Sequence, residues 1–154
     1  MTKTNNLTYL IHHLASVLTK QSDQLLKEQL GIGFSQYRIL MALEWNPRIQ
    51  QSVIASNLGQ TEASISRQIK LLKNKGLLTS KIDHTNKRRH ISVPTPMGMQ
   101  VTEAANQVLK QGFTKDFEAI GESKTAKLSQ SLELLHDQIC AGNRAGACNH
   151  SINL

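Results

Sequence analysis

Basic side chains are concentrated in one stretch of this 154-residue chain. Residues 61–90 hold eight lysines and arginines and only two acids, so this stretch carries a net +6 of the chain's +7. Ammonium and guanidinium groups bind phosphates, and an arginine placed against a base edge can donate two hydrogen bonds to guanine. A pI near 9.7 favours an anionic partner without separating nucleic acid from an acidic membrane surface. The clustering of the charge favours nucleic acid.

The first part of this stretch predicts a helix that turns small polar and basic side chains towards solvent. Thr61 is a suitable N-cap and Gly76 a suitable C-terminal stop, while apolar residues at i, i+4 and i+7 form the buried stripe. Arg67 lies among small residues that would let the helix approach base edges, which favours a base contact over a solvated surface arginine. Lysines later in the helix suit phosphates better. The candidate contact residues of this helix are Thr61, Ser64, Arg67, Gln68, Lys70 and Lys73.

The second part predicts a two-stranded ribbon with a basic tip. Residues 77–82 and 90–93 are short strand-like runs, and residues 83–89 between them have the composition of a turn. A basic tip can enter the narrow minor groove, where the phosphates focus negative potential. A solvated turn is the alternative. The candidate residues at the tip are Lys87, Arg88 and Arg89.

Helices are predicted on both sides of this stretch. Apolar residues at helical spacing predict a long helix over about residues 6–30, followed by two shorter helices, the first of them capped by Ser35. After the ribbon, Thr95 and Pro96 form the N-cap and N1 pair of another long helix, and Ser123 is a plausible cap for the last one. The predicted fold class is therefore mainly α with a small two-stranded β-ribbon.

The two helices that meet at Gly59-Gln60 have the ingredients of a helix-turn-helix. Together with the ribbon, they resemble the MarR family of winged-helix transcription regulators. The resemblance extends over nearly the whole chain and rests on the order and spacing of four segments. These are FSQYRIL (34–40), IASNLG (54–59), the recognition helix with its exit into the wing (64–78), and the wing tip (83–89).

The resemblance implies both a fold and a function. It implies a winged helix-turn-helix lobe over about residues 34–95 and dimerisation helices over about 6–30 and 96–140, which together form one domain over residues 1–140. Residues 141–154 lack a core pattern and are expected to be a flexible tail. The implied function is sequence-specific transcription regulation, most often repression. A homodimer would bind a palindromic operator in double-stranded DNA and would be released by a small-molecule or redox effector.

Two positions depart from the family pattern. The family usually has an aspartate at the position of Asn86, which would orient the wing arginines by a charge-assisted pair. Arg88, which matches the family's wing arginine, is therefore expected to be held less firmly. Pro94 replaces a leucine, so the second strand is expected to end early.

Other functions fit parts of the pattern. The terminal apolar stripes agree with a dimer, but on their own they could equally be an internal bundle core. A winged-helix module for protein–protein assembly is one alternative, which the lysine-rich face disfavours. A nonspecific architectural DNA-binding protein is the other, and the ratio of specific to nonspecific affinity would decide.

The resemblance also implies an effector pocket between the dimerisation helices and the DNA-binding lobe. Ordinary positions on amphipathic helices are the default interpretation of each candidate residue. The candidates are His12, His13, Tyr37, Arg38 and Trp45.

No metal site or cofactor is predicted. His136 and Cys140 are four residues apart and would share a helical face, as two ligands must. Cys148 and His150, however, fall in a tail without an ordering signal. Control by cysteine oxidation has the same weakness, because only Arg144 is near enough to lower a thiol pKa.

The sequence gives little support to an enzyme or a membrane protein. It contains no phosphate-binding glycine loop, no Gly-x-Ser-x-Gly elbow and no close group of carboxylates or histidines. The longest apolar run, residues 39–43, is far short of the roughly 20 residues of a membrane helix, and no signal peptide is recognisable. Two cysteines fit a reducing compartment, so a cytoplasmic location is expected.

Overall fold

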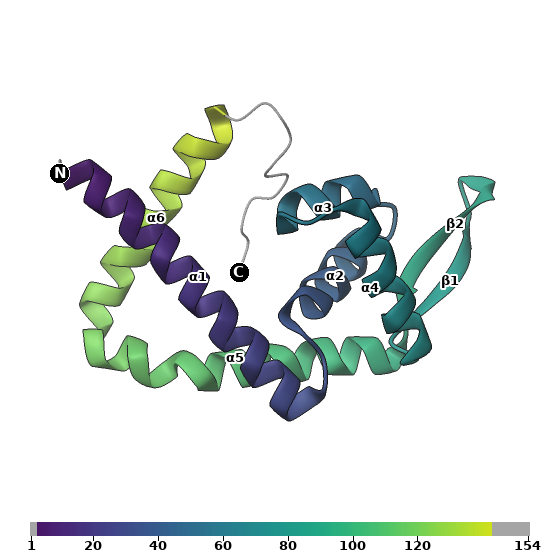
Figure 1. The fold of residues 1–154 in the computed structure, drawn as a ribbon, viewed down its shortest axis with the longest axis horizontal. Coiled ribbons are helices and arrows are strands. Elements are labelled where there is room, and N and C mark those ends of the chain that lie inside the picture. Colours follow the sequence, from purple (N-terminus) through teal and green to yellow (C-terminus); the bar gives the residue numbers. More distant parts are fainter. Residues whose placement is uncertain (1–2, 143–154) are drawn as a thin grey trace.

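The computed structural model describes residues 3–142, with the side chains of residues 6–88 and 90–139. In chain order the elements are α1 (Lys3–Leu30), α2 (Phe34–Trp45), α3 (Gln51–Leu58), α4 (Glu62–Asn74), β1 (Leu78–Asp83), β2 (Asn86–Pro94), α5 (Pro96–Ile120) and α6 (Glu122–Gly142). Helices α2, α3 and α4 form a lobe from which the β1–β2 hairpin projects (Figure 1). The long helices α1, α5 and α6 form a separate frame beside it. The predicted class, mainly helical with a small ribbon, is confirmed.

The hydrophobic core lies where the lobe meets α1 and α5. Ala105 of α5 is fully buried in the same cluster as the lobe residues. The hydroxyl of Tyr37 donates a hydrogen bond to Oδ1 of Asn106 at 2.6 Å, which ties α2 to α5. The lobe is therefore anchored to the frame through α2. The largest fully buried apolar side chains are those of Leu26, Ile32, Ile39, Leu40, Ile54, Ile65 and Leu72.

Two of the predicted helix caps are confirmed. Oγ1 of Thr61 accepts a hydrogen bond from the N–H of Ser64 at 3.2 Å, so α4 begins as expected. Oγ1 of Thr95 likewise accepts from the N–H of Gly98 at 3.0 Å, with Pro96 at the first helical position of α5. Both caps span three residues, which makes them readable from local sequence.

Two other predicted caps are wrong. Helix α2 begins at Phe34, one residue before Ser35, because Oδ1 of Asp23 in α1 accepts the N–H of Phe34 at 3.0 Å. Helix α6 begins at Glu122, so Ser123 lies inside its first turn. The chain enters α6 through Gly121, whose φ of 90° is in the region that favours glycine.

The hairpin is a two-stranded antiparallel sheet, as predicted, and is called the wing below. Its second strand does not end early: Pro94 is paired with Leu78, and the N–H of Thr95 then donates to the carbonyl of Leu77 at 3.0 Å. A proline is tolerated where its missing N–H is not needed by a partner strand, and both strands of a two-stranded ribbon are edge strands. The wing base is therefore firmly joined to the start of α5.

The expected flexible tail over residues 141–154 overlaps the end of α6. Helix α6 continues to Gly142, and the rest of the expected flexible tail, residues 143–154, lies outside the described residues.

Among the helices that the structure describes, none is long and apolar enough to cross a membrane.

Candidate nucleic-acid interface

Helices α3 and α4 are joined by a tight turn. Gly59 adopts a left-handed conformation, with φ 64° and ψ 35°, and the N–H of Gln60 donates to the carbonyl of Ala55 at 2.9 Å. A residue with a side chain would be strained at this φ. The turn therefore fixes the angle at which α4 leaves α3, as a helix-turn-helix requires.

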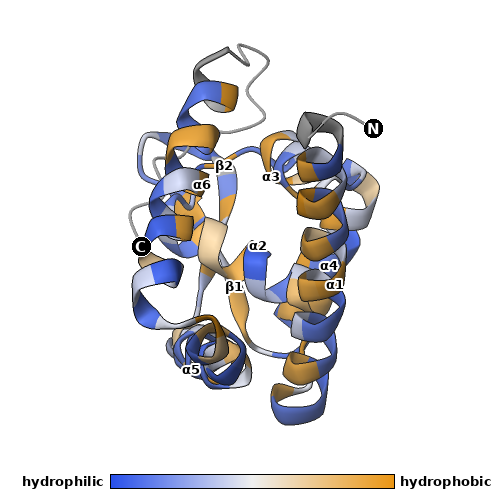
Figure 2. Cartoon of the chain, turned by 90° about the vertical axis from the view of Figure 1, so that its left-hand side faces the viewer, coloured by the Kyte–Doolittle hydropathy of each residue, from blue (hydrophilic) through white to orange (hydrophobic). Residues whose placement is uncertain are grey.

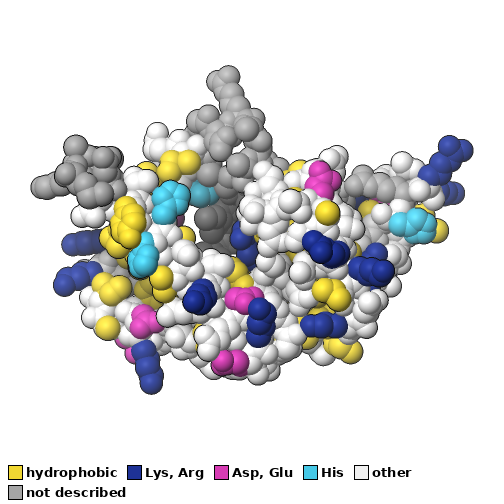
Figure 3. Space-filling view, viewed as in Figure 1, with side chains coloured by type: hydrophobic (Ala, Val, Ile, Leu, Met, Phe, Trp, Pro, Cys, Tyr) yellow, Lys and Arg dark blue, Asp and Glu magenta, His cyan; other side chains and the backbone are white. Residues whose placement is uncertain are grey.

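Helix α4 presents a basic outer face. Ile65, Ile69 and Leu72 are buried against the lobe, whereas Arg67 and Lys70 are exposed on the opposite side. Thr61 is also exposed at the start of the helix. Figure 3 shows Lys and Arg side chains over the lobe and at the tip of the wing. The exposed positions of Arg67 and Lys70 leave both side chains accessible to an anionic partner.

Ser64 and Gln68 are turned partly towards α2, not fully towards solvent as the sequence suggested. Oγ of Ser64 donates to Oε1 of Gln60 at 3.2 Å, and Nε2 of Gln36 donates to Oε1 of Gln68 at 2.9 Å. Each precedes a buried isoleucine, so the two lie on the flank of the apolar stripe. One flank of α4 is thus hydrogen-bonded to the start of α2.

The lysines at the end of α4 hold neighbouring elements. Nζ of Lys73, a predicted phosphate ligand, donates to Oγ of Ser80 in β1 at 2.7 Å. Nζ of Lys75 donates to the carbonyl of Gly31 at 2.7 Å. Lys73 therefore links α4 to the wing, and its ammonium group retains two further donors.

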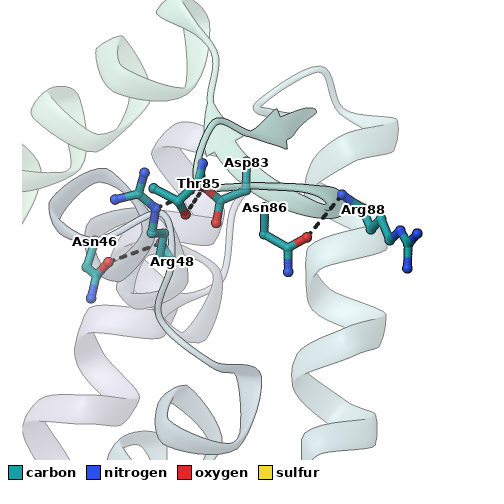
Figure 4. Close-up of polar contacts among 6 residues, drawn as sticks. All are labelled: Asn46, Arg48, Asp83, Thr85, Asn86 and Arg88. Carbon is teal, nitrogen blue, oxygen red and sulfur yellow. Dashed lines mark hydrogen bonds and ion pairs between the residues drawn. The ribbon is translucent and has the colours of Figure 1, made fainter.

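A buried carboxylate organises the turn of the wing (Figure 4). Asp83 is 1% exposed, and its Oδ1 accepts from the N–H and hydroxyl of Thr85 at 3.0 and 2.7 Å. Nε of Arg48, from the loop between α2 and α3, donates to the same oxygen at 3.1 Å. The N–H and hydroxyl of Thr85, together with Arg48, outweigh the effect of burial and lower the pKa of Asp83 from 3.8 to about 2. This ion pair fastens the wing turn to the lobe.

Arg48 and Asp83 were not recognised as a pair from the sequence. The spacing of Asp83 and Thr85 is a signal for an Asx turn, in which an aspartate accepts from the backbone two residues on. Nothing in the local sequence points to Arg48, which is 35 residues away. Asn46 supports it, since its Oδ1 accepts the N–H of Arg48 at 3.0 Å.

The tip of the wing carries exposed basic side chains. Lys87 and Arg88 are both exposed, and Figure 4 shows the guanidinium of Arg88 directed away from the turn. Oδ1 of Asn86 accepts the backbone N–H of Arg88 at 3.1 Å, so this side chain orders the backbone of the turn. The side chain of Arg89 is outside the described ones.

The sequence of residues 30–89, which includes nearly all of the lobe and most of the wing, matches the model of the MarR family. The winged-helix lobe is thus similar in sequence to MarR-family proteins, and the described residues have the fold of solved MarR-family structures. Solved MarR-family structures superimpose over most of their length. A regulator from Acinetobacter sp. ADP1 is 23% identical, with a TM-score of 0.71 over 92% of this chain and 99% of that one. Escherichia coli MarR is 19% identical, with a TM-score of 0.73 over 84% and 96%. Staphylococcus aureus MepR, solved as a DNA complex, is 21% identical, with a TM-score of 0.66 over 90% and 98%. No curated protein matches the sequence.

The effector-pocket candidates are scattered over this MarR fold. His12 and His13 are exposed on α1, where the ring of His13 stacks on Tyr9 with centroids 6.0 Å apart. Trp45 is 64% exposed at the end of α2. Tyr37 is buried, and burial together with the charge of Glu103 raises its pKa, so its hydroxyl stays protonated as a donor. The structure does not bring these residues together.

Arg38 has a structural contact in the lobe. Its Nη2 donates to the backbone carbonyl of Asn57 at 3.1 Å, near the end of α3, and its guanidinium lies over the ring of Phe34. Burial lowers the pKa of Arg38. This contact joins α2 to α3, so Arg38 has a structural role that requires no bound effector.

None of the five effector-pocket candidates lines either of two hollows on the surface of the described residues. The larger, of about 800 Å³, lies between α5 and α6 and is lined by Phe113 and Phe117 among others. The smaller, of about 230 Å³, lies beside the wing and includes Ile69 and His90.

Within the described residues, no group of three or more His, Cys, Asp or Glu side chains could hold a metal ion. Nδ1 of His136 lies 3.3 Å from Oδ1 of Asp137. The side chain of Cys140 and all of Cys148 and His150 lie outside the described part of the chain.

Proposed function

We propose that the chain is a DNA-binding transcription regulator whose α4 enters the major groove while the wing tip contacts the adjacent minor groove. The observation that carries this proposal is the pairing of an exposed basic face on α4, with Arg67 at its centre, and an exposed basic wing tip. Side chains on such a helix can donate hydrogen bonds to base edges. Basic side chains on the wing can bind preferentially where the minor groove is narrow. The MepR–DNA complex supports the proposal by its shared fold.

The regulator acts as a homodimer on a palindromic site. Large apolar side chains on α1 and α6 are exposed in the single chain, and hydrophobic residues, orange in Figure 2, recur along both helices. Contiguous apolar surface of this kind marks an interaction site. A two-fold pairing of these helices would place two α4 helices about one turn of DNA apart. The exposed side chains include Leu7, Leu10, Leu14, Val17, Leu128, Leu132, Leu135 and Ile139.

A small-molecule effector would release such a dimer from its operator, which makes the regulator a repressor. Relatives of the same fold were solved with p-aminosalicylic acid, in a Mycobacterium tuberculosis protein, and with p-coumaroyl-CoA, in Rhodococcus jostii CouR. An effector acts in this way only if it binds more tightly to the dimer whose two lobes are wrongly spaced for the operator than to the dimer that fits the operator. We place the site of action in the cytoplasm, where the operator is.

The decisive test is Arg67→Ala on the operator found by selecting from a random DNA pool. We expect the affinity for the operator to fall by about 1–3 kcal/mol and the preference at one symmetric base pair to relax. The exposed Lys115, in the C-terminal half of α5, provides a control variant, Lys115→Ala, that should change neither. An equal loss on operator and random DNA would demote Arg67 to a phosphate contact. Failure of the unmodified protein to select any sequence would refute the proposed function.

A further inference from the structure

Gln36 holds a buried position between the start of α2 and the recognition helix α4. Its side chain is 8% exposed. Its Oε1 accepts the N–H of Gly33 at 3.3 Å, and its Nε2 donates to Oε1 of Gln68 at 2.9 Å. The two ends of one amide thus contact two different elements, a backbone turn and α4.

These two hydrogen bonds fix the orientation of both amides. A backbone N–H can only donate, so the Gln36 atom that faces Gly33 must be the carbonyl oxygen. The opposite end of Gln36 is then its NH₂ group, which has no acceptor capacity. The Gln68 atom that meets this group must therefore be Oε1, which leaves Nε2 of Gln68 on the side away from Gln36.

The orientation of Gln68 determines which base edges it can recognise. In the major groove, thymine presents only an acceptor, its keto oxygen, and cytosine presents only a donor, its amino group, whereas guanine and adenine both present the acceptor N7. A glutamine that can use both ends of its amide pairs with adenine. Oε1 of Gln68 is held against the NH₂ group of Gln36, so the end of the Gln68 amide that is directed away from Gln36 is its own NH₂ donor.

We propose that Gln36 is a positioning residue that directs the NH₂ donor of Gln68 towards the DNA, so that Gln68 prefers thymine over cytosine at one position of each half-site. Gln68 is partly exposed and directly follows Arg67 on α4, so its free N–H lies beside the main candidate for base contact. This inference rests on the proposed function.

Gln36→Glu should reverse the preference. A carboxylate at position 36 can still accept the N–H of Gly33, and its position in the first turn of α2 is one where a negative charge is stabilised. Its second oxygen can only accept, so the amide of Gln68 must turn over and donate to it. Oε1 of Gln68 then faces the DNA and accepts from adenine or cytosine.

The assay begins with the operator that the unmodified protein selects from a random pool. The position read by Gln68 is the symmetric base pair whose preference Gln68→Ala abolishes. Duplexes with each of the four bases there are then titrated with each protein. We expect about a tenfold preference for thymine over cytosine, as for one hydrogen bond gained or lost, and an inversion to cytosine over thymine in Gln36→Glu.

Two further variants separate orientation from side effects. Gln51→Glu adds the same charge at the exposed start of α3, outside the Gln36–Gln68 contact, and should lower affinity without changing the preference. Gln36→Met removes the donor at similar volume and should collapse the tenfold preference to nearly none. If Gln36→Glu does not fold, Gln36→Met alone tests whether Gln36 orients the amide of Gln68.

The outcomes distinguish this inference from the proposed function. A protein that selects no operator refutes both. A protein that selects one, but whose Gln68→Ala variant loses no base preference, or whose Gln36 variants keep the original preference for thymine over cytosine, refutes only the inference. A preference for cytosine over thymine in the unmodified protein would do the same.

Discussion

Replacing Arg88 by alanine should make operator binding less sensitive to salt. The Arg88 side chain is exposed at the tip of the wing and points away from the turn (Figure 4). Each phosphate neutralised by a lysine or arginine adds about 0.9 to the slope of log K against log salt. A homodimer carries two wings, so the slope should become shallower by about 1.8.

This change in slope is large enough to measure by titration. The affinity advantage of the unmodified protein over Arg88→Ala should shrink about 3.5-fold with each doubling of salt, and about twelvefold between roughly 50 and 200 mM. Fluorescence anisotropy with a labelled operator would follow it. A second pair of duplexes, with A·T-rich or G·C-rich flanks, tests groove insertion, because a narrow minor groove attracts arginine.

Lys115→Ala is the matched control, since it removes the same charge from an exposed position in the C-terminal half of α5. Its slope should equal that of the unmodified protein. If Arg88→Ala also keeps the original slope and flank preference, the wing tip does not contact DNA and the reasoning is wrong. A shallower slope without a change in flank preference would assign Arg88 to phosphates alone.

Three further outcomes are expected from other parts of the fold. The pKa of Asp83 is about 2 in the folded protein and 3.8 ordinarily, so its stabilising contribution is complete above about pH 4 and lost as the pH falls through 2. The free energy of unfolding, measured in urea across this range, should therefore fall more steeply with acid for the unmodified protein than for Asp83→Asn, and parallel curves would contradict the lowered pKa. Gly98→Ala would place a Cβ 2.1 Å from the carbonyl oxygen of Leu77, and should cost about 1–3 kcal/mol of unfolding free energy; a neutral effect would contradict the close packing of α5 on the wing base. Leu14→Glu and Leu132→Glu, at side chains 47% and 45% exposed in the single chain, should give folded monomers in sedimentation, whereas intact dimers would locate the interface elsewhere.

The parts of the fold that depend on local sequence were predictable. The caps formed by Thr61 and Thr95 each join a side chain to an N–H three residues on. The apolar stripe of α4 was equally readable, since helical periodicity alone determines which residues face the core. Local chemistry thus located α4 and the wing.

Contacts between distant residues were not predictable from one sequence. Ser35 looked like a cap because nothing nearby revealed that Asp23, from another helix, accepts the first N–H of α2. Gln68 looked exposed because its partner, Gln36, is 32 residues away. In each case a polar group could form a hydrogen bond either within its own segment or with a distant element, and the structure has the distant one. Sequence propensities describe only bonds within a segment.

Helix α4 and the turn of the wing are both held to α2 or to the loop that follows it. Gln36, in the first turn of α2, holds α4, and Arg48, in the loop after α2, holds the wing turn through Asp83. Tyr37, beside Gln36, joins the same helix to α5 through Asn106. Because these contacts converge on α2 and the loop that follows it, a shift of α2 would carry α4 and the turn of the wing together, while the base of the wing stays joined to the start of α5. In the proposed dimer, an effector that alters the spacing of the two lobes can therefore act without disturbing the hydrogen bonds that orient Gln68 and the wing turn.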